Sequence, residues 1–215
     1  MKLALFPLHT VLFPGMSLPL HIFEPRYLQL VDRCLETNSA FGVVLIQSGR
    51  EVGGPATPYT VGTTARISAA ERLPDGRLNI EAVGQQRFQI TELHDDQPFL
   101  TGTVADFPLA GAGDRLAWTS ARVLLPWLRR YLSLLGEAAE TRLEHKDLPR
   151  DPASIGYLAA IVAQIPSPEK QALLATGAAA ELLQRERAIY RREISLLRAM
   201  RDRDRAQDAA GFSPN

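Results

Sequence analysis

The sequence changes its pattern near residue 110, and this change constrains the fold more than any other feature. Before it, short runs rich in Val, Ile, Thr and Phe alternate with Gly and Pro, which is typical of β-strands joined by turns. After it, Ala, Leu, Arg and Glu dominate with helical spacing. The expected hinge is the Gly- and Ala-rich segment Leu109-Ala110-Gly111-Ala112-Gly113. We therefore expect an α+β chain with a β-rich domain at 1–109 and an α-helical domain at 114–205.

The β-rich part is expected to close into a small barrel or a strongly bent sheet. Phe41–Ile46 is continuously apolar, as in a strand buried on both faces. Pro74-Asp75-Gly76 favours a tight turn between two alternating segments. One helix should begin at Pro25, because proline suits a first helical position, and run to about Glu36. The expected strands are 41–46, 65–73, 78–83, 86–93 and 100–107, and five or six such strands can form a barrel.

The second part is expected to form a helical bundle. Asp114 should cap a long helix that ends at Gly136, with a kink or break at Pro126. Asp151-Pro152 and Ser167-Pro168 each place a capping side chain before a proline, which indicates two further helix starts. The expected helices after Gly136 are 152–165, 168–176 and 179–203. The tail at 206–215 has little apolar character and is expected to be disordered.

Charge and cysteine content restrict the class of protein. Lysines and arginines equal the acidic residues in number, 24 each, so no overall field attracts nucleic acid or an anionic membrane. The lone Cys34 excludes an internal disulfide and favours a reducing, cytoplasmic location. Lys2 and the apolar residues after it imitate a signal peptide, but Pro7, Pro14 and Pro19 break the run. No apolar stretch is long enough to cross a bilayer.

The segment His21-Ile22-Phe23-Glu24-Pro25-Arg26-Tyr27 carries the densest set of reactive groups. An imidazole, a carboxylate, a guanidinium and a phenol are the material of acid–base catalysis. The structural interpretation is stronger, because a carboxylate is favoured near a helix N-terminus and Arg26 and Tyr27 can brace the turn. No nucleophile with a nearby base, phosphate-binding glycine loop or metal-ligand spacing is recognisable. We expect no catalytic, cofactor-binding or metal-binding residues.

The last helix has the clearest charge pattern. Arginines recur from Arg185 to Arg205, with glutamates and aspartates interspersed. Mixed signs at helical spacing predict a solvated, self-paired face more than a nucleic-acid contact. The opposite stripe is apolar and is expected to pack within the bundle, while a partner helix is the alternative.

A series of short motifs follows in a fixed order along the N-terminal half. They are Phe6-Pro7-Leu8, Val11-Leu12-Phe13-Pro14-Gly15, Leu18-Pro19-Leu20-His21-Ile22-Phe23-Glu24-Pro25-Arg26-Tyr27, Phe41-Gly42-Val43-Val44-Leu45-Ile46, Val61-Gly62-Thr63, Leu73-Pro74-Asp75-Gly76-Arg77 and Arg87-Phe88. The second half adds Asp151-Pro152 and Glu169-Lys170-Gln171-Ala172-Leu173-Leu174. With these motifs the chain resembles the substrate-recognition domain of Lon-type ATP-dependent proteases, including its helical part, over about residues 3 to 200.

This resemblance implies a bent, PUA-like β-barrel or pseudo-barrel with one inserted helix, followed by an α-helical bundle. It also implies recognition of protein substrates, including unfolded segments. A full Lon protease continues into an ATPase with a phosphate-binding loop and a peptidase with a serine–lysine pair, which this sequence lacks. The chain therefore resembles the stand-alone form of the recognition domain, and we expect no enzymatic activity.

Our leading hypothesis is a module that binds unfolded or extended protein segments, as an adaptor or as a holder, with a separate protease or chaperone as partner. An apolar, proline-rich N-terminus beside sheet edges would suit an extended peptide. The candidate peptide-binding residues are Phe13, Met16, His21, Arg26 and Tyr27. The alternatives are RNA binding by the PUA-like barrel and a small ligand in a cleft between barrel and bundle. Membrane binding and nucleic-acid binding are not expected from the composition.

Overall fold

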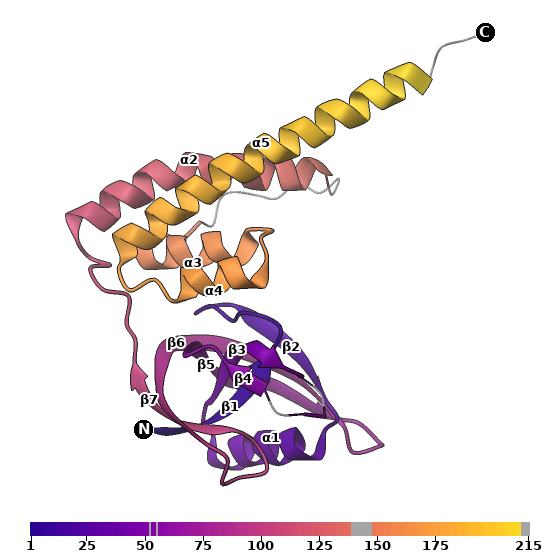
Figure 1. The fold of residues 1–215 in the computed structure, drawn as a ribbon, viewed down its shortest axis with the longest axis vertical. Helices are drawn as coiled ribbons and strands as arrows, with labels where there is room; N and C mark the ends of the chain where they lie inside the picture. Colours follow the sequence, from indigo (N-terminus) through magenta and orange to yellow (C-terminus); the bar gives the residue numbers. More distant parts are fainter. Residues whose placement is uncertain (52, 55, 139–147, 212–215) are drawn as a thin grey trace. The chain divides into compact units, whose positions relative to one another are not determined.

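The computed structural model describes residues 1–51, 53–54, 56–138 and 148–211. In these residues, five helices and a seven-stranded, mainly antiparallel sheet form the fold (Figure 1). The strands are β1 (Lys2–Leu8), β2 (Ser17–Ile22), β3 (Phe41–Gly49), β4 (Ala56–Pro58), β5 (Val61–Arg72), β6 (Leu78–His94) and β7 (Thr101–Asp106). The helices are α1 (Pro25–Thr37), α2 (Arg115–Ala138), α3 (Pro152–Val162), α4 (Ser167–Leu174) and α5 (Ala179–Gly211).

The chain divides into two compact units, and neither unit is continuous in sequence. The strand unit contains Met1–Ala110 and also Ala160–Gly177, which includes α4. The helical unit contains Gly111–Ala159 and the chain from Ala178 onward. The chain passes from the strand unit to the helical unit after Ala110, and the later segment that carries α4 belongs to the strand unit.

The strands of the first unit close into a circuit. The order β1-β7-β6-β5-β3 is completed by a parallel pairing of β1 with β3, in which Leu5 lies opposite Gly42. The expected hairpin is confirmed: Arg72 of β5 pairs with Leu78 of β6, and the backbone N–H of Gly76 donates to the carbonyl of Leu73. Gly76 has a φ of 85°, a conformation that glycine adopts without strain.

One expected division between strands is wrong. The segments 78–83 and 86–93 form a single strand, β6, because Gly84 does not make a turn. A Cβ atom at Gly84 would lie 2.2 Å from the carbonyl oxygen of Phe13, so glycine is needed here for a close backbone approach. The N–H of Gly15 donates to the carbonyl of Gly84 and the N–H of Gly84 to that of Met16, which ties the N-terminal segment to β6.

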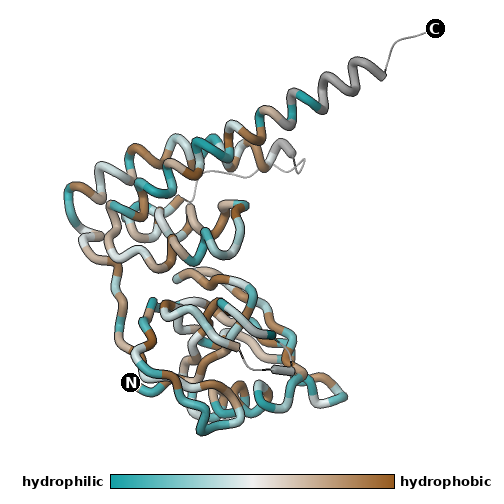
Figure 2. The backbone as a smooth tube through the Cα atoms, in the orientation of Figure 1, coloured by the Kyte–Doolittle hydropathy of each residue, from teal (hydrophilic) through white to brown (hydrophobic). Residues whose placement is uncertain are grey.

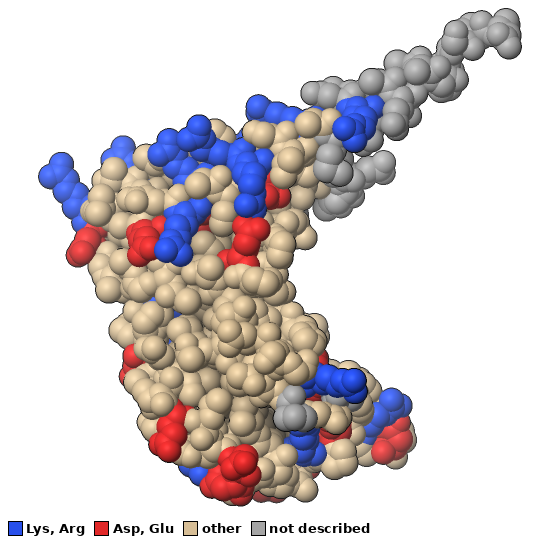
Figure 3. Space-filling model, in the orientation of Figure 1, with Lys and Arg blue, Asp and Glu red and all other residues tan. Residues whose placement is uncertain are grey.

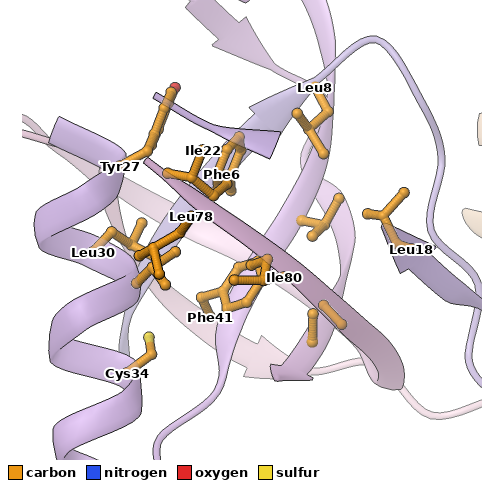
Figure 4. Close-up of a cluster of buried hydrophobic side chains, with 14 of the residues drawn as sticks. Phe6, Leu8, Leu18, Ile22, Tyr27, Leu30, Cys34, Phe41, Leu78 and Ile80 are labelled. Carbon is orange, nitrogen blue, oxygen red and sulfur yellow. The ribbon is translucent and has the colours of Figure 1, made fainter. Parts of the chain in front are cut away.

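The core of the strand unit lies between α1 and the sheet. Figure 4 shows Tyr27, Leu30 and Cys34 of α1 directed toward Phe6, Phe41 and Leu78 of the strands. All of these side chains are buried, and burying each large apolar side chain stabilises the fold by about 1.5–3 kcal/mol. The helix begins and ends close to the expected residues, and the continuous burial of Phe41–Ile46 is as the apolar run predicts.

Helix α4 is attached to the strands by side chains that bond backbone carbonyls. Arg87 of β6 is 3% exposed, and its guanidinium donates hydrogen bonds of 2.6 Å to the carbonyls of Leu174 and Thr176. Gln171 donates to the carbonyl of Val61. The Ser167 hydroxyl donates to the carbonyl of His9 and does not cap its own helix, which corrects that expectation.

In the helical unit α2 packs against α5, and α5 contacts α3. The ring of Tyr131 meets that of Tyr190 edge-on at 4.9 Å, and the Tyr190 hydroxyl donates to the carbonyl of Ala159 at 2.7 Å. Figure 2 shows hydrophobic and hydrophilic stretches alternating along α2 and α5, as expected for helices with one buried face. Helix α2 is not broken at Pro126, and Asp151 caps α3 through the N–H of Ser154.

Two helix ends differ from expectation by three residues or more. Helix α3 ends at Val162 and not near Ile165, and α5 extends to Gly211, past the expected end at Arg203. Part of the expected disordered tail is therefore helical, while 212–215 lies outside the described residues. Within the described part of the chain, no helix has the length and apolar character needed to cross a membrane.

Replacing Arg87 with Met should destabilise the strand unit by about 3 kcal/mol, because the carbonyls of Leu174 and Thr176 would stay buried without their donor. Urea denaturation followed by circular dichroism measures the change. Arg33→Met is the matched control, because Arg33 is exposed and has no ion pair among the described residues. Equal stability of the two variants would contradict the role of Arg87.

Glu186 of α5 makes the stability of the helical unit depend on pH. Its carboxylate is buried, neither oxygen has a hydrogen-bond partner among the described residues, and burial raises the pKa of Glu186 well above its usual value. Because the folded-state pKa is the higher one, stability is full below the unfolded-state pKa and decreases as the pH rises toward the folded-state pKa. Glu186→Gln should therefore match the wild type in stability at pH 4 and be more stable than the wild type at pH 8.

Urea denaturation followed by tryptophan fluorescence tests this, because both tryptophans, Trp118 and Trp127, lie in α2. The control is Glu181→Gln in the same helix, where the carboxylate is half exposed and pairs with Arg185 at 2.7 Å. That change should alter stability by less than about 1 kcal/mol at either pH. A Glu186→Gln variant that is less stable than the wild type at pH 8 would refute the assignment.

Candidate functional site

The turn between β2 and α1 positions the reactive groups that the sequence brings together. Glu24 precedes Pro25, and its carbonyl accepts the first helical N–H groups, those of Tyr27 and Leu28, at 3.0 Å each. Its carboxylate does not cap the helix; it lies 3.0 Å from the guanidinium of Arg26 and accepts the N–H of Gly53 at 3.3 Å. The carboxylate therefore joins the helix start to the loop between β3 and β4.

Arg26 completes this brace. Its guanidinium donates to the backbone carbonyls of Glu51 at 3.2 Å and Gly54 at 3.4 Å, in addition to the carboxylate of Glu24. These bonds fix the loop that leads into the short strand β4. The predicted bracing role of Arg26 is confirmed, although the partner is this loop and not the central strands.

Tyr27 is held between Arg26 and the core. Its ring stacks on Phe6 with centroids 4.0 Å apart, and the Arg26 guanidinium lies 4.5 Å from the ring centre. Burial raises the pKa of Tyr27 to about 12, so the phenol stays protonated at neutral pH and cannot serve as a general base. Figure 4 shows its hydroxyl at the edge of the cluster, directed away from Leu30.

Arg26 and Tyr27 line a cavity of about 190 Å³ in the strand unit. Its wall is largely apolar, and it includes one cation, Arg26, and one carboxylate, Asp95. The other lining residues are Pro7, Ala56, Gln97, Pro98, Phe99 and Leu100. A cavity that holds a single water needs only about 10–15 Å³ of such volume. The volume of about 190 Å³ is many times larger, so the cavity has room for an apolar side chain.

An edge strand runs beside this cavity. Ala56, which lines it, is the first residue of β4, and β4 is the last strand in the sheet order. Among the described residues β4 pairs only with β3, where Ala56 lies opposite Gly49 and Pro58 opposite Ile46. The other side of β4 therefore offers backbone groups to an added strand.

The remaining candidates lie elsewhere. Phe13 is fully buried in the core, and Met16, partly buried, packs against the apolar cluster of the strand unit. His21 is exposed on β2, where its Nδ1 lies 2.7 Å from the amide oxygen of Asn79 and its Nε2 lies 3.3 Å from Arg77. Of the five candidates, the structure brings only Arg26 and Tyr27 together at a cavity.

Sequence reasoning missed the opposite wall of this cavity. Pro98, Phe99 and Leu100 follow β6 and are distant in sequence from Tyr27, so only the closed sheet brings them near it. The run Pro98-Phe99-Leu100 after two aspartates was an available signal, since an apolar run after a polar loop indicates a buried contact. Phe99 is 4% exposed.

A larger cavity of about 360 Å³ lies against β1 and the end of α1. Its lining includes Leu3, Arg33, Cys34, Ser39 and Gln97. Burial raises the pKa of the Cys34 thiol, which lowers the fraction of the reactive thiolate form. Among the described residues no three metal-ligating side chains cluster there or elsewhere.

Comparisons with known proteins agree on one family. Residues 2–190 match the family model described as the ATP-dependent protease La (LON) substrate-binding domain. Lon protease 1 of Herpetosiphon aurantiacus is 25% identical over 202 residues, and Lon protease 2 of Myxococcus xanthus is 27% identical over 199. These matches cover 91% and 88% of this chain but only 25% and 24% of the relatives. The chain thus spans about a quarter of their length.

Solved structures give the same assignment. A Lon N-terminal domain protein from Xanthomonas campestris is 28% identical with a TM-score of 0.59, and the match covers 86% of this chain and 95% of that one. The N-terminal domain of a Mycobacterium avium complex Lon protease has the same fold, with a TM-score of 0.62 at 18% identity over 88% and 98% of the two chains. The chain therefore belongs to the family of ATP-dependent protease La (LON) substrate-binding domains.

Proposed function

We propose that this protein binds extended or unfolded segments of other proteins at the edge of β4, with one apolar side chain of the segment in the cavity that Tyr27 and Phe99 line. The observation that carries the proposal is the position of the cavity directly beside an edge strand with one free side. Membership in a substrate-binding family supports the same class of ligand.

Strand addition explains how such a site can accept many sequences. The added segment gains affinity from main-chain hydrogen bonds, which do not depend on its side chains, and selectivity from the pocket beside the edge. The contacts of Arg26 with Glu24, Glu51 and Gly54 hold the loop before β4 in place. A fixed edge loses less conformational entropy when a segment binds.

The proposal assigns the chain a non-enzymatic role as an adaptor or holder, with a separate protease or chaperone as its partner. His21 contacts Asn79 and Arg77, and Glu24 contacts Arg26. None of these contacts places a nucleophile beside a base. The closed circuit of strands supports a PUA-like barrel as part of the proposal. The free, buried thiol of Cys34 supports a cytoplasmic location.

Replacing Gln97 with Trp should weaken binding of an unfolded protein by at least about fivefold. Gln97 is an exposed loop residue that lines the 190 Å³ cavity, so a bulky ring there fills the space without disturbing the core. The probe is a reduced, carboxymethylated and fluorescently labelled model protein, titrated with the full chain and followed by anisotropy. Binding in the range of tens of micromolar or tighter is expected for the wild type.

Two control variants isolate the cavity. Gln89→Trp places the same ring at an exposed glutamine of β6 that does not line the cavity, and it should bind like the wild type. A second control is needed because Gln97 lines both cavities. Ser39 lines only the 360 Å³ cavity, so Ser39→Trp narrows that cavity and leaves the 190 Å³ cavity unchanged. Loss of binding in Ser39→Trp would move the site to the larger cavity, and full binding in Gln97→Trp would refute the proposed position.

A further inference from the structure

Helix α2 carries an unbalanced positive charge. Between Arg115 and Gly136 it contains four arginines and no acidic residue. None of these arginines has a carboxylate within ion-pair distance in the described part of the chain. Figure 3 shows Lys and Arg side chains gathered over the α2 and α5 part of the molecule.

Helix α5 does not compensate this charge, although its sequence mixes both signs. Glu181 pairs with Arg185, and Glu193 pairs with Arg192. Glu186 is 1% exposed and lies in the core of the helical unit, so its carboxylate is not available to a surface arginine. The self-paired face expected from the sequence therefore holds for two arginines and is wrong for Arg187, Arg191 and Arg198, which have no described ion pair.

The unpaired arginines of α5 form one row that lies along α2. At 100° per residue, Arg187, Arg191 and Arg198 fall within about 40° of each other around the helix. The guanidinium of Arg191 lies 5.9 Å from the ring centre of Trp127 on α2, which fixes the level at which the two helices meet. On α2, Arg130 lies one turn beyond Trp127 and is exposed.

An apolar stripe lies between these arginines. Leu116, Val123 and Trp127 fall within about 40° of each other on α2. Leu116 is 60% exposed and Val123 is 40% exposed, while Trp127 is partly buried under Arg191. The stripe is thus bordered by Arg130 on one side and by the arginine row of α5 on the other.

We propose that this arginine–tryptophan face, formed by Val123, Trp127, Arg130, Arg187, Arg191 and Arg198, binds an acidic amphipathic helix of a partner protein. The apolar side chains of that helix would cover Val123 and Trp127, as in other helix-in-groove contacts. Its carboxylates would meet the guanidinium groups, which form strong, charge-assisted hydrogen bonds with carboxylates. Charge complementarity is the reason for an acidic partner, because the six-residue face contains four cations and no anion.

The same face is less suited to single-stranded nucleic acid. Such binding relies on exposed aromatic rings on which bases stack. The ring of Trp127 is already covered by Arg191, and the other residues of the stripe are aliphatic. The more exposed Trp118 lies about 160° away from Leu116 around α2 and does not belong to the stripe.

The test uses the full chain and a fluorescein-labelled synthetic peptide whose helical form has leucines at i, i+3 and i+7 with glutamates on both flanks. The double variant Arg187→Glu with Arg191→Glu should raise the Kd by at least about tenfold. The variant with Lys at both positions should stay within about threefold of the wild type, since the charge is retained. Binding should weaken as salt rises from 50 to 300 mM, because the contacts are electrostatic.

Arg185→Glu is the matched control: it lies on the same helix, is exposed and pairs with Glu181, on a different side from the arginine row. It should leave peptide affinity within about twofold of the wild type, and Gln97→Trp should do the same if the face is independent of the β4 site. Peptide affinity that survives the double reversal would overturn the proposal. So would a single-stranded RNA oligonucleotide that binds at least tenfold more tightly than the peptide and is lost in the same variant.

Discussion

The buried guanidinium of Arg87 is the interaction on which the strand unit depends. Helix α4 ends at Leu174, and the last carbonyls of a helix have no partners within it. Arg87 reaches two carbonyls at this end, those of Leu174 and Thr176, and its guanidinium also lies 4.7 Å from the ring of Phe107. A charged side chain can be buried at such a place because helix C-termini favour cations. Gln171 and Ser167 of α4 add hydrogen bonds to the carbonyls of Val61 and His9, so Arg87 anchors the end of the helix and these two side chains anchor the rest.

Local sequence patterns predicted the helices and strands of this fold better than the way in which these elements are distributed between the two units. The Pro74-Asp75-Gly76 turn and the start of α1 at Pro25 depend on residues next to each other, and both form where the sequence indicates. The return of α4 to the strands depends on Arg87, which is 87 residues from Leu174, and no periodicity records such a contact. The expected break between strands at Gly84 was wrong for a related reason. The backbone of Phe13, whose close approach requires glycine at this position, lies far away in sequence.

The candidate site was predictable to the same extent. Arg26 and Tyr27 were expected to brace a turn, because the helix start at Pro25 lies next to them in sequence. The partners through which Arg26 does so, the carbonyls of Glu51 and Gly54, are distant in sequence and could not be predicted. Phe13 was a weaker candidate, because burial in the core follows from its tertiary contacts. The cavity needs the loop at 97–100 and the start of β4, which become neighbours of Tyr27 only when β1 pairs with β3 and the circuit closes.

The net charge of the sequence also says little about its surface. Equal numbers of acids and bases suggested a neutral molecule with self-paired helices. However, a carboxylate neutralises a surface arginine only if both stay on the surface, and Glu186 lies in the core, where burial raises its pKa. Burying one acid of α5 while α2 contains none between Arg115 and Gly136 leaves a cationic face on a chain with zero formal charge. The placement of Glu186 by packing therefore contributes to the surface charge as directly as the arginines themselves do.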